Sequence, residues 1–76
     1  MQRFGEKMRT LRTRHGMTIR ELATALGYAP SFNSYISDVE NGKRRPKIDF
    51  VLKVAQLFQV STDQLVRDDL ELDAPG

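Results

Sequence analysis

The spacing of hydrophobic residues at the start of the chain predicts a helix. One stripe, with members three or four positions apart, lines a single face and consists of Phe4, Met8, Leu11 and His15. The opposite face is expected to be exposed and carries Lys7, Arg9 and Arg14. We expect this helix to run from about Gln2 to His15 and to end at Gly16, which can adopt the left-handed conformation of a C-terminal cap.

A second helix is predicted to begin at Thr18. Thr18 and Glu21 form a capping box, in which the Thr18 hydroxyl accepts from the Glu21 amide and the Glu21 carboxylate reaches back. The helix continues through Leu26, and Gly27 ends it. Ala23 is small at an inward position, which suits a close crossing by another helix.

A third helix is expected after a loop at Tyr28-Ala29-Pro30. Ser31 or Asn33 can cap its N-terminus, and Asn41-Gly42 closes it. Its inward stripe is formed by Tyr35 or Ile36 together with Val39.

The remaining sequence predicts two more helices. One runs from about Ile48 to Phe58, with a stripe made of Ile48, Val51, Leu52, Ala55 and Phe58. A second capping box at Ser61 and Gln64 opens a short helix through Leu65 and Val66. No segment alternates between apolar and polar residues with the period of a strand. The expected fold is therefore all-α, a compact bundle of five short helices.

Composition excludes several classes of protein. At 76 residues the chain has room for one small domain. It has no cysteine, so neither disulfides nor thiolate metal sites can hold the fold. No apolar run approaches the roughly 20 residues that span a membrane, and the N-terminus lacks the apolar core of a signal peptide. We expect a cytoplasmic protein without a membrane partner.

Charge is unevenly distributed along the chain. The net charge is only +2, yet residues 1–67 hold all 12 Lys and Arg and six of the 10 acids. Residues 68–76 hold the other four acids and no base. This division predicts a basic binding domain over residues 1–67 and an acidic tail over residues 68–76. A basic domain favours nucleic acid as a partner, although an ordinary solvated surface can have the same charge.

No catalytic or metal-binding constellation is evident. His15 is the only histidine, and a helix-end residue that interacts with the dipole explains it best. The acids of the tail lack the ligand spacing of a calcium loop. There is no nucleophile beside a base and no glycine-rich phosphate loop, so we expect neither an enzyme nor a cofactor.

Four segments resemble, in order and at nearly the expected spacing, the helix-turn-helix family of phage Cro and repressor proteins, often called Xre-like. They are LRTRHGMT (11–18), ELATALG (21–27), SYISDVENGKRRP (34–46) and LKVAQLFQVSTDQLV (52–66). The resemblance covers roughly residues 4–66. It implies a lambda-repressor-like domain in which the second and third helices form the helix-turn-helix, with the third in the major groove of DNA. Members are usually dimeric transcription regulators, so the expected location is the nucleoid.

The resemblance assigns base contacts to the third helix. Asn33, Ser34 and Ser37 match base-facing positions, and Asp38 lies next on that face. Asn33 can bind adenine through two hydrogen bonds, and the serines can pair with several bases. Asp38 can accept from cytosine N4 or deter other sequences. The alternative is that Ser31 or Asn33 only caps the helix and that Ser37 and Asp38 are solvated.

Residues on either side of the third helix are candidates for the DNA backbone. Those that follow it directly are Lys43, Arg44, Arg45 and Lys47. Thr18 and Arg20, at the start of the second helix, are further candidates. The family often has glutamine after the capping threonine, where this chain has Ile19, so a phosphate there would depend on the helix amides.

A different role is implied for Arg12 and Glu40. The family often pairs an arginine near the end of the first helix with a glutamate at the end of the third, and these two residues match the positions. The resemblance therefore implies a partly buried ion pair that braces the third helix. Losing one partner would strand the other charge, which is costly when it is buried.

The chain has an insertion relative to the family. Six residues, Tyr28 to Asn33, separate Gly27 from Ser34, where three are usual. Because Pro30 disfavours a helical Ala29, we expect a lengthened turn. Either Ser31 caps a third helix extended by one turn, which moves Phe32 toward DNA, or a loop bulges and Phe32 folds back as core. Both leave the core-facing residues in phase, so binding is expected to survive.

These observations predict a sequence-specific transcription regulator, most simply a repressor, that binds a palindromic operator in double-stranded DNA as a homodimer. An apolar patch for the dimer could come from Leu65, Val66, Leu70 and Leu72. The alternative is an antitoxin or another protein-interaction module, whose main partner is a protein bound by the acidic tail.

Overall fold

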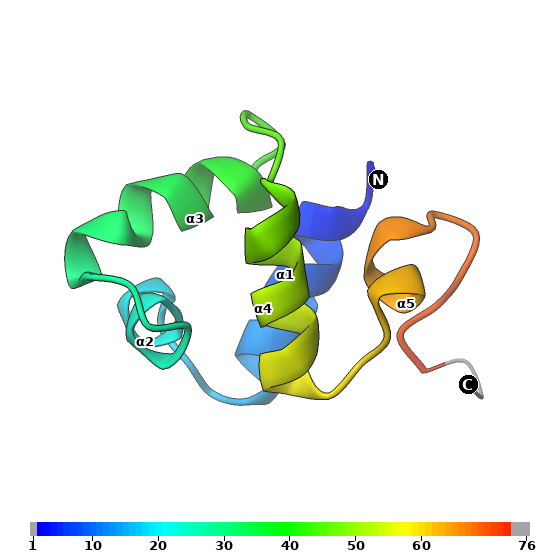
Figure 1. The fold of residues 1–76 in the computed structure, drawn as a ribbon, viewed down its shortest axis with the longest axis horizontal. Helices are drawn as coiled ribbons and strands as arrows, with labels where there is room; N and C mark the ends of the chain where they lie inside the picture. Colours follow the sequence, from blue (N-terminus) through cyan, green and yellow to red (C-terminus); the bar gives the residue numbers. More distant parts are fainter. Residues whose placement is uncertain (1, 74–76) are drawn as a thin grey trace.

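The structure, a computed structural model, describes residues 2–73, and these form five α-helices and one 3-10 turn (Figure 1). The elements are α1 (Phe4–Arg14), α2 (Ile19–Ala25), η1 (Pro30–Phe32), α3 (Asn33–Glu40), α4 (Ile48–Phe58) and α5 (Thr62–Val66). No strand occurs among the described residues. The predicted all-α fold with five helices is confirmed, and η1 is an addition to it.

Local sequence signals set most helix ends. The Thr18 hydroxyl accepts from the Glu21 amide at 3.1 Å, and the Glu21 carboxylate accepts from the Thr18 amide at 2.8 Å, so the capping box is complete. Ser61 and Gln64 form the same reciprocal pair at the start of α5. Gly16 and Gly27 follow α1 and α2 with φ of +66° and +89°, a conformation that favours glycine. These predicted boundaries are confirmed.

The hydrophobic core uses the predicted stripe of α1 apart from His15, which is exposed, and the predicted inward residues of α2 and α3. On α4 the core differs from the prediction at several positions. Phe50 and Val54 are buried on α4, whereas Ile48 and Leu52 are 68% and 51% exposed. The stripe predicted for α4 was therefore wrong at these two positions. The buried face includes Phe50 and Val54, because the Phe50 ring packs against Phe4 of α1 and Tyr35 of α3. Ile48 and Leu52 remain as an apolar pair, one turn apart, on the outside.

The helices are arranged on two sides of a central pair. α2 and α3 lie on one side of α1 and α4, and α5 lies on the other (Figure 1). Gly5, in the first turn of α1, faces the end of α3 so closely that a methyl group there would overlap the Val39 carbonyl oxygen. The missing side chain thus permits a tight crossing of α1 and α3.

Lys7 contradicts the sequence prediction, which placed it on the exposed face of the first helix. The residue is only 2% exposed. Its ammonium donates to the carbonyl oxygens of Gln64, Arg67 and Leu70 at 2.6, 2.8 and 2.7 Å. Carbonyls at the end of a short helix lack intrahelical donors and carry partial negative charge, so a three-donor ammonium suits them. Helical periodicity cannot reveal these partners, which lie about 60 residues away.

The acidic residues that follow α5 contact α1. The Asp68 carboxylate accepts from the amides of Gln2 and Arg3 at 3.1 and 3.0 Å, and so holds the two residues that precede α1. The hydrogen bond from the Arg3 amide is the main reason that the pKa of Asp68 lies below its usual range. Glu71 and Asp73 form ion pairs with Arg3 and Arg14. The boundary at residue 67 stays a prediction, and residues 74–76 of the predicted tail lie outside the described residues.

Replacing Lys7 with methionine should destabilise the protein strongly. Methionine keeps the apolar stem but leaves three partly buried carbonyls without their donor, and each buried unsatisfied group costs about 1–3 kcal/mol. We expect a loss of at least about 2 kcal/mol in the free energy of unfolding, measured by urea denaturation. The control is Lys43→Met, since Lys43 is exposed. Equal stability of the two variants would contradict the assigned role of Lys7.

Candidate nucleic-acid interface

The four predicted base-reading residues lie together in the structure. Asn33, Ser34, Ser37 and Asp38 come from the outer face of α3, and with Ile19 of α2 they line a shallow groove between the two helices. We call these five residues the reading groove. Ser34 is exposed, and the other four are partly exposed, so short polar side chains at the start of α3 face solvent. The groove can offer both hydrogen-bond donors and acceptors to a ligand.

The inserted segment forms one extra helical turn. Ala29 is extended, with ψ of 151°, and Pro30 begins η1, whose last residue is followed directly by α3. Neither Ser31 nor Asn33 caps α3 through its side chain, so that prediction was wrong. Proline at the first position supplies a fixed φ, and it starts the turn without a polar cap. The helical run is thus lengthened, as the first of the two alternatives expected.

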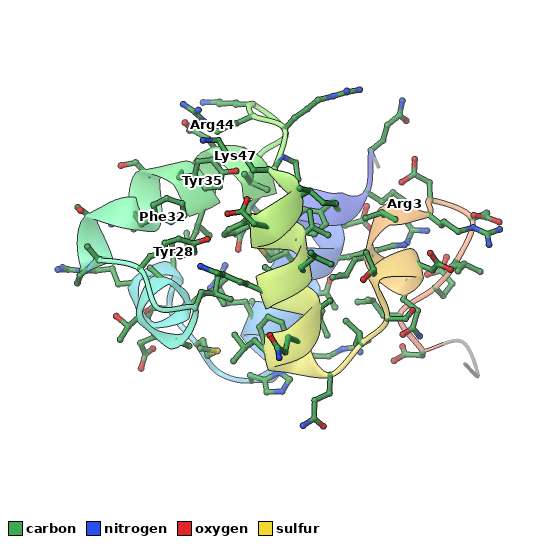
Figure 2. All side chains as sticks on the ribbon, viewed as in Figure 1. Arg3, Tyr28, Phe32, Tyr35, Arg44 and Lys47 are labelled. Carbon is green, nitrogen blue, oxygen red and sulfur yellow. The ribbon has the colours of Figure 1, made fainter. Side chains whose placement is uncertain are left out.

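Phe32 nevertheless follows the second alternative, since it packs inward. Its ring stacks on Tyr28 with centroids 4.1 Å apart and lies 4.6 Å from the Tyr35 ring. Tyr35 in turn meets Phe50 of α4 edge-on at 5.2 Å. Figure 2 shows the labelled Tyr28, Phe32 and Tyr35 in a column beneath α3. This aromatic column attaches the extra turn to the core, because offset and edge-on ring pairs add attraction beyond burial.

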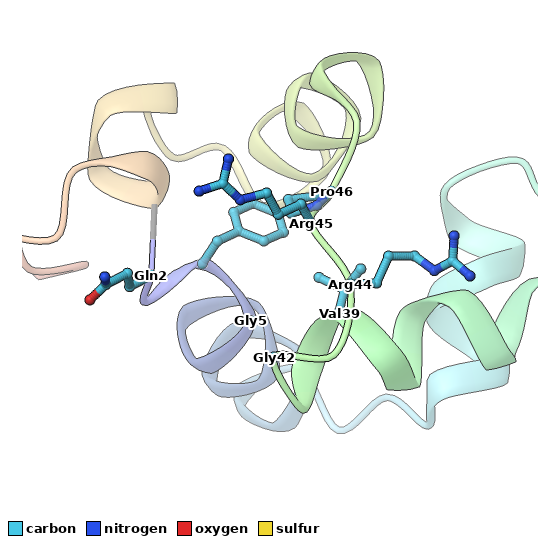
Figure 3. Close-up of a pocket in the computed structure, with 8 residues that line it drawn as sticks. Gln2, Gly5, Val39, Gly42, Arg44, Arg45 and Pro46 are labelled. Atoms are coloured by element: carbon cyan, nitrogen blue, oxygen red, sulfur yellow. The ribbon is translucent and has the colours of Figure 1, made fainter.

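Tyr35 also holds the basic loop that follows α3. Its hydroxyl accepts from the Lys47 amide at 3.0 Å, and the Arg44 guanidinium lies 5.4 Å from its ring centroid. Lys43, Arg44, Arg45 and Lys47 are all exposed. Arg44 and Arg45 point in opposite directions from the loop, across a recess lined by Gln2, Gly5 and Pro46 among others (Figure 3). Four cations are therefore held at the C-terminal end of α3.

The start of α2 presents Thr18 and Arg20 to solvent. The Thr18 hydroxyl already accepts from Glu21, so it retains its proton as a donor. The amides of Ile19 and Arg20 belong to the first turn, which has no intrahelical acceptors. The hydrogen bond from the Thr18 amide is the main cause that lowers the pKa of Glu21, so this carboxylate is ionised at neutral pH.

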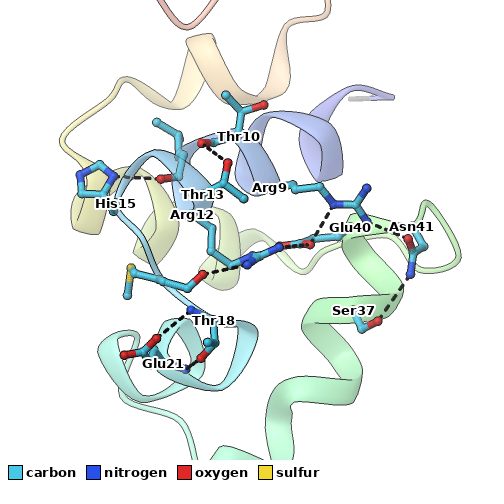
Figure 4. Close-up of polar contacts among 12 residues, drawn as sticks. Arg9, Thr10, Arg12, Thr13, His15, Thr18, Glu21, Ser37, Glu40 and Asn41 are labelled. Atoms are coloured by element: carbon cyan, nitrogen blue, oxygen red, sulfur yellow. Dashed lines mark hydrogen bonds and ion pairs between the residues drawn. The ribbon is translucent and has the colours of Figure 1, made fainter.

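A network of charged side chains joins α1 to the end of α3. The Glu40 side chain is 1% exposed, and it accepts from Arg12 Nε at 2.8 Å and from Arg9 Nε at 3.1 Å. Arg12 also donates to the Met17 carbonyl at 2.8 Å, and Arg9 donates to the Asn41 side-chain oxygen at 2.8 Å (Figure 4). The buried carboxylate thus has two cationic partners.

Sequence analysis missed three members of this surface: Arg9, Asn41 and Tyr35. Arg9 precedes Arg12 by one turn, so both can face the same acid, but the family resemblance concerns only Arg12. Asn41 follows Ser37 by four positions, which is the spacing of helical neighbours. The hydrophobic pattern predicts only a core position for Tyr35. Its contact with Lys47 depends on the path of the loop between α3 and α4.

Three further observations concern the described residues. No group of three or more histidine, aspartate or glutamate residues within 2–73 could hold a metal ion. His15 Nδ1 lies 2.9 Å from the Leu11 carbonyl oxygen, and its ring lies 4.9 Å from that of Phe58. None of the helices in this range has the length and apolar character needed to cross a bilayer.

Comparison with known proteins connects this geometry to a family. A family model described as helix-turn-helix matches residues 8–65. The HTH-type transcriptional repressor RghR of Bacillus subtilis strain 168 is 36% identical over 67 residues, which are 87% of this chain and 47% of that protein. The HTH-type transcriptional regulator ImmR of the same strain is 34% identical over 66 residues, which are 87% and 50%. The chain therefore spans about half the length of these relatives. No solved structure matches it significantly.

Replacing Arg12 with alanine should destabilise the protein in the absence of any ligand. The change leaves the buried Glu40 carboxylate with Arg9 alone and also removes a donor from Met17. Breaking a buried ion pair costs about 3 kcal/mol or more, and we expect a loss of this order in urea denaturation. Arg14→Ala, on the same helix as Arg12, is the control. It breaks an exposed ion pair with Asp73, so the free energy of unfolding should change little. The brace is rejected if Arg12→Ala is no less stable than Arg14→Ala.

Proposed function

The chain belongs to the Xre-like helix-turn-helix family, and from this premise we propose that it is a transcription regulator that binds double-stranded DNA with sequence specificity. The observation that carries the proposal is the reading groove, where four short polar side chains of α3 meet the start of α2. A repressor is the simplest form of such a regulator, because occupancy of DNA alone can block transcription. The place of action would be the nucleoid.

In this proposal α3 enters the major groove, which is wide enough for one helix. Asn33 would bind adenine through its amide, and Ser34 and Ser37 would contact base edges near it. The Asp38 carboxylate would accept a hydrogen bond from cytosine N4. Its negative charge would disfavour DNA sequences that bring a phosphate close to it. The extra turn η1 lengthens the helical run toward DNA, with Ser31 as its exposed polar residue.

Backbone contacts would come from the start of α2 and from the loop that follows α3. Thr18 and Arg20 lie at the start of α2, and the second group of candidates is Lys43, Arg44, Arg45 and Lys47. Cations that neutralise phosphates release counterions, so binding should weaken steeply with salt. Tyr35 supports this role because it fixes the loop that carries the second group.

We further propose a homodimer that uses the exposed face of α4. Leu65 is fully buried, so it cannot contribute to the dimer patch suggested by the sequence. Ile48 and Leu52, which are exposed one turn apart, offer a replacement. A two-fold pair would place the two α3 helices about 34 Å apart, one turn of DNA.

The rival function, a protein-interaction module bound through its acidic tail, is less favoured. Asp68, Glu71 and Asp73 use their carboxylates on α1, so a partner would have to displace these contacts. Deleting the tail would also remove the bonds from Asp68 to the two residues that precede α1. Loss of a partner in such a variant would therefore not identify the tail as its binding site.

Selection of random duplex DNA, followed by a salt titration on the enriched sequence, tests the proposed function. We expect a palindrome with half-sites about one turn apart and an affinity that falls steeply with salt. Arg44→Ala should weaken binding to all sequences and reduce the salt slope by about one. Arg67→Ala is the matched control, since Arg67 is exposed, follows α5 and pairs with the neighbouring Asp69. Absence of any enriched sequence would contradict specific DNA binding.

The dimer is tested by Leu52→Lys. A charge at this position should prevent two apolar faces from meeting, so the variant should sediment as a monomer and select a single half-site. Thr13→Lys adds the same charge at an exposed position on α1, on the side opposite its core stripe, and should leave the dimer intact. A palindrome that is still selected by Leu52→Lys would contradict this interface without affecting the proposal of DNA binding.

A further inference from the structure

The hydroxyl of Ser37 is hydrogen-bonded to Asn41, which is not one of the predicted base-reading residues. Asn41 Nδ2 donates to Ser37 Oγ at 3.4 Å, and Asn41 Oδ1 accepts from Arg9 Nη2 at 2.8 Å (Figure 4). Asn41 lies four positions after Ser37, at the end of α3. A chain of hydrogen bonds therefore runs from α1 through Asn41 into the reading groove.

The direction of this chain is fixed by its first member. A guanidinium has only donors, so the atom of Asn41 that faces Arg9 must be its oxygen, and the amide NH2 must face Ser37. The short bond from Arg9 sets this orientation. Arg9 in turn is held by the buried Glu40 carboxylate, which cannot move toward solvent without breaking its bonds to Arg12.

The polarity of Ser37 follows from the orientation of Asn41. Its oxygen accepts from the Asn41 amide, so one of its two lone pairs is used and its single proton does not point along the helix toward Asn41. Within residues 2–73 the Ser37 hydroxyl has no other hydrogen-bond partner. The proton is therefore available to the reading groove, where Ser37 lies beside Ser34 and Asp38.

We propose that Arg9 and Asn41 favour hydrogen-bond donation by Ser37 in the reading groove, because they occupy one of its lone pairs and leave its proton facing the groove. The base that faces Ser37 would then be one that presents acceptors to the major groove, guanine through N7 and O6 or thymine through O4, in preference to cytosine, which presents the N4 donor. Arg9 and Asn41 are positioning residues for specificity, and neither contacts the base itself. The inference rests on the proposed function and assigns a preference within it.

Asn41→Asp tests the inference because it has nearly the same shape and the opposite polarity. One carboxylate oxygen would still accept from Arg9, and the other would accept from Ser37, whose proton then turns away from the groove. Ser37 would offer lone pairs to the base instead, which suit cytosine N4. At the position read by Ser37, we expect the wild type to favour guanine or thymine over cytosine by about fivefold, and Asn41→Asp to reverse this order.

The measurement is competitive binding to duplexes that differ only at one base. The introduced Asp repels the phosphates of every such duplex equally, so this repulsion cancels when their affinities are compared. The Ser37→Ala variant first identifies the base position that Ser37 reads. The base preference at that position should vanish in this variant, while the preferences at other positions remain. Ser37→Ala with Asn41→Asp should then equal Ser37→Ala alone, and Asn41→Ala should lose the preference without reversing it. Thermal unfolding of each variant checks that it folds.

The possible failures can be distinguished. If Ser37→Ala changes no preference, or if Asn41→Asp keeps the wild-type order at the Ser37 position, the inference is overturned and DNA binding stands. If the wild type enriches no sequence at all, the proposed function is overturned, and the inference that rests on it is overturned as well.

Discussion

The buried carboxylate of Glu40 is the constraint on which the placement of α3 depends. A carboxylate with 1% exposure must have cationic partners, because an unpaired buried charge costs several kcal/mol. Arg12 and Arg9 supply them from α1, and Arg12 also binds the Met17 carbonyl in the turn before α2. One acid thus connects the first helix, the turn before α2 and the end of α3. The close approach at Gly5 holds the same end of α3 against α1.

The two ends of α3 are held by different physical interactions. Ion pairs and close packing fix its C-terminal end, whereas the aromatic column of Tyr28, Phe32 and Tyr35 supports the N-terminal end and the extra turn. The polar face between them lines the reading groove, where Asn41 holds Ser37. A rigid helix with a solvent-facing polar surface is a suitable base for recognition, because little order has to be gained when a ligand binds.

Local signals explain which parts of the structure could be predicted from the sequence. The two capping boxes and the glycines after α1 and α2 act within a few residues, so their effects can be read directly. Lys7, Asp68 and the exposed pair on α4 could not be predicted, because their surroundings come from segments more than 40 residues away or from how several helices meet. The inserted segment follows part of each predicted alternative. It lengthens the helical run before α3, and its Phe32 packs inward. Arg12 and Glu40 were paired only through the family resemblance.

The most direct test of the central claim is to map, by amide chemical shifts, which residues respond when duplex DNA is added to the whole chain. The account predicts that the largest changes fall on residues 18–20, 31–38 and 43–47, with residues 61–73 nearly unchanged. Changes concentrated on residues 61–73, with α3 unaffected, would contradict the claim that α3 is the element that reads DNA.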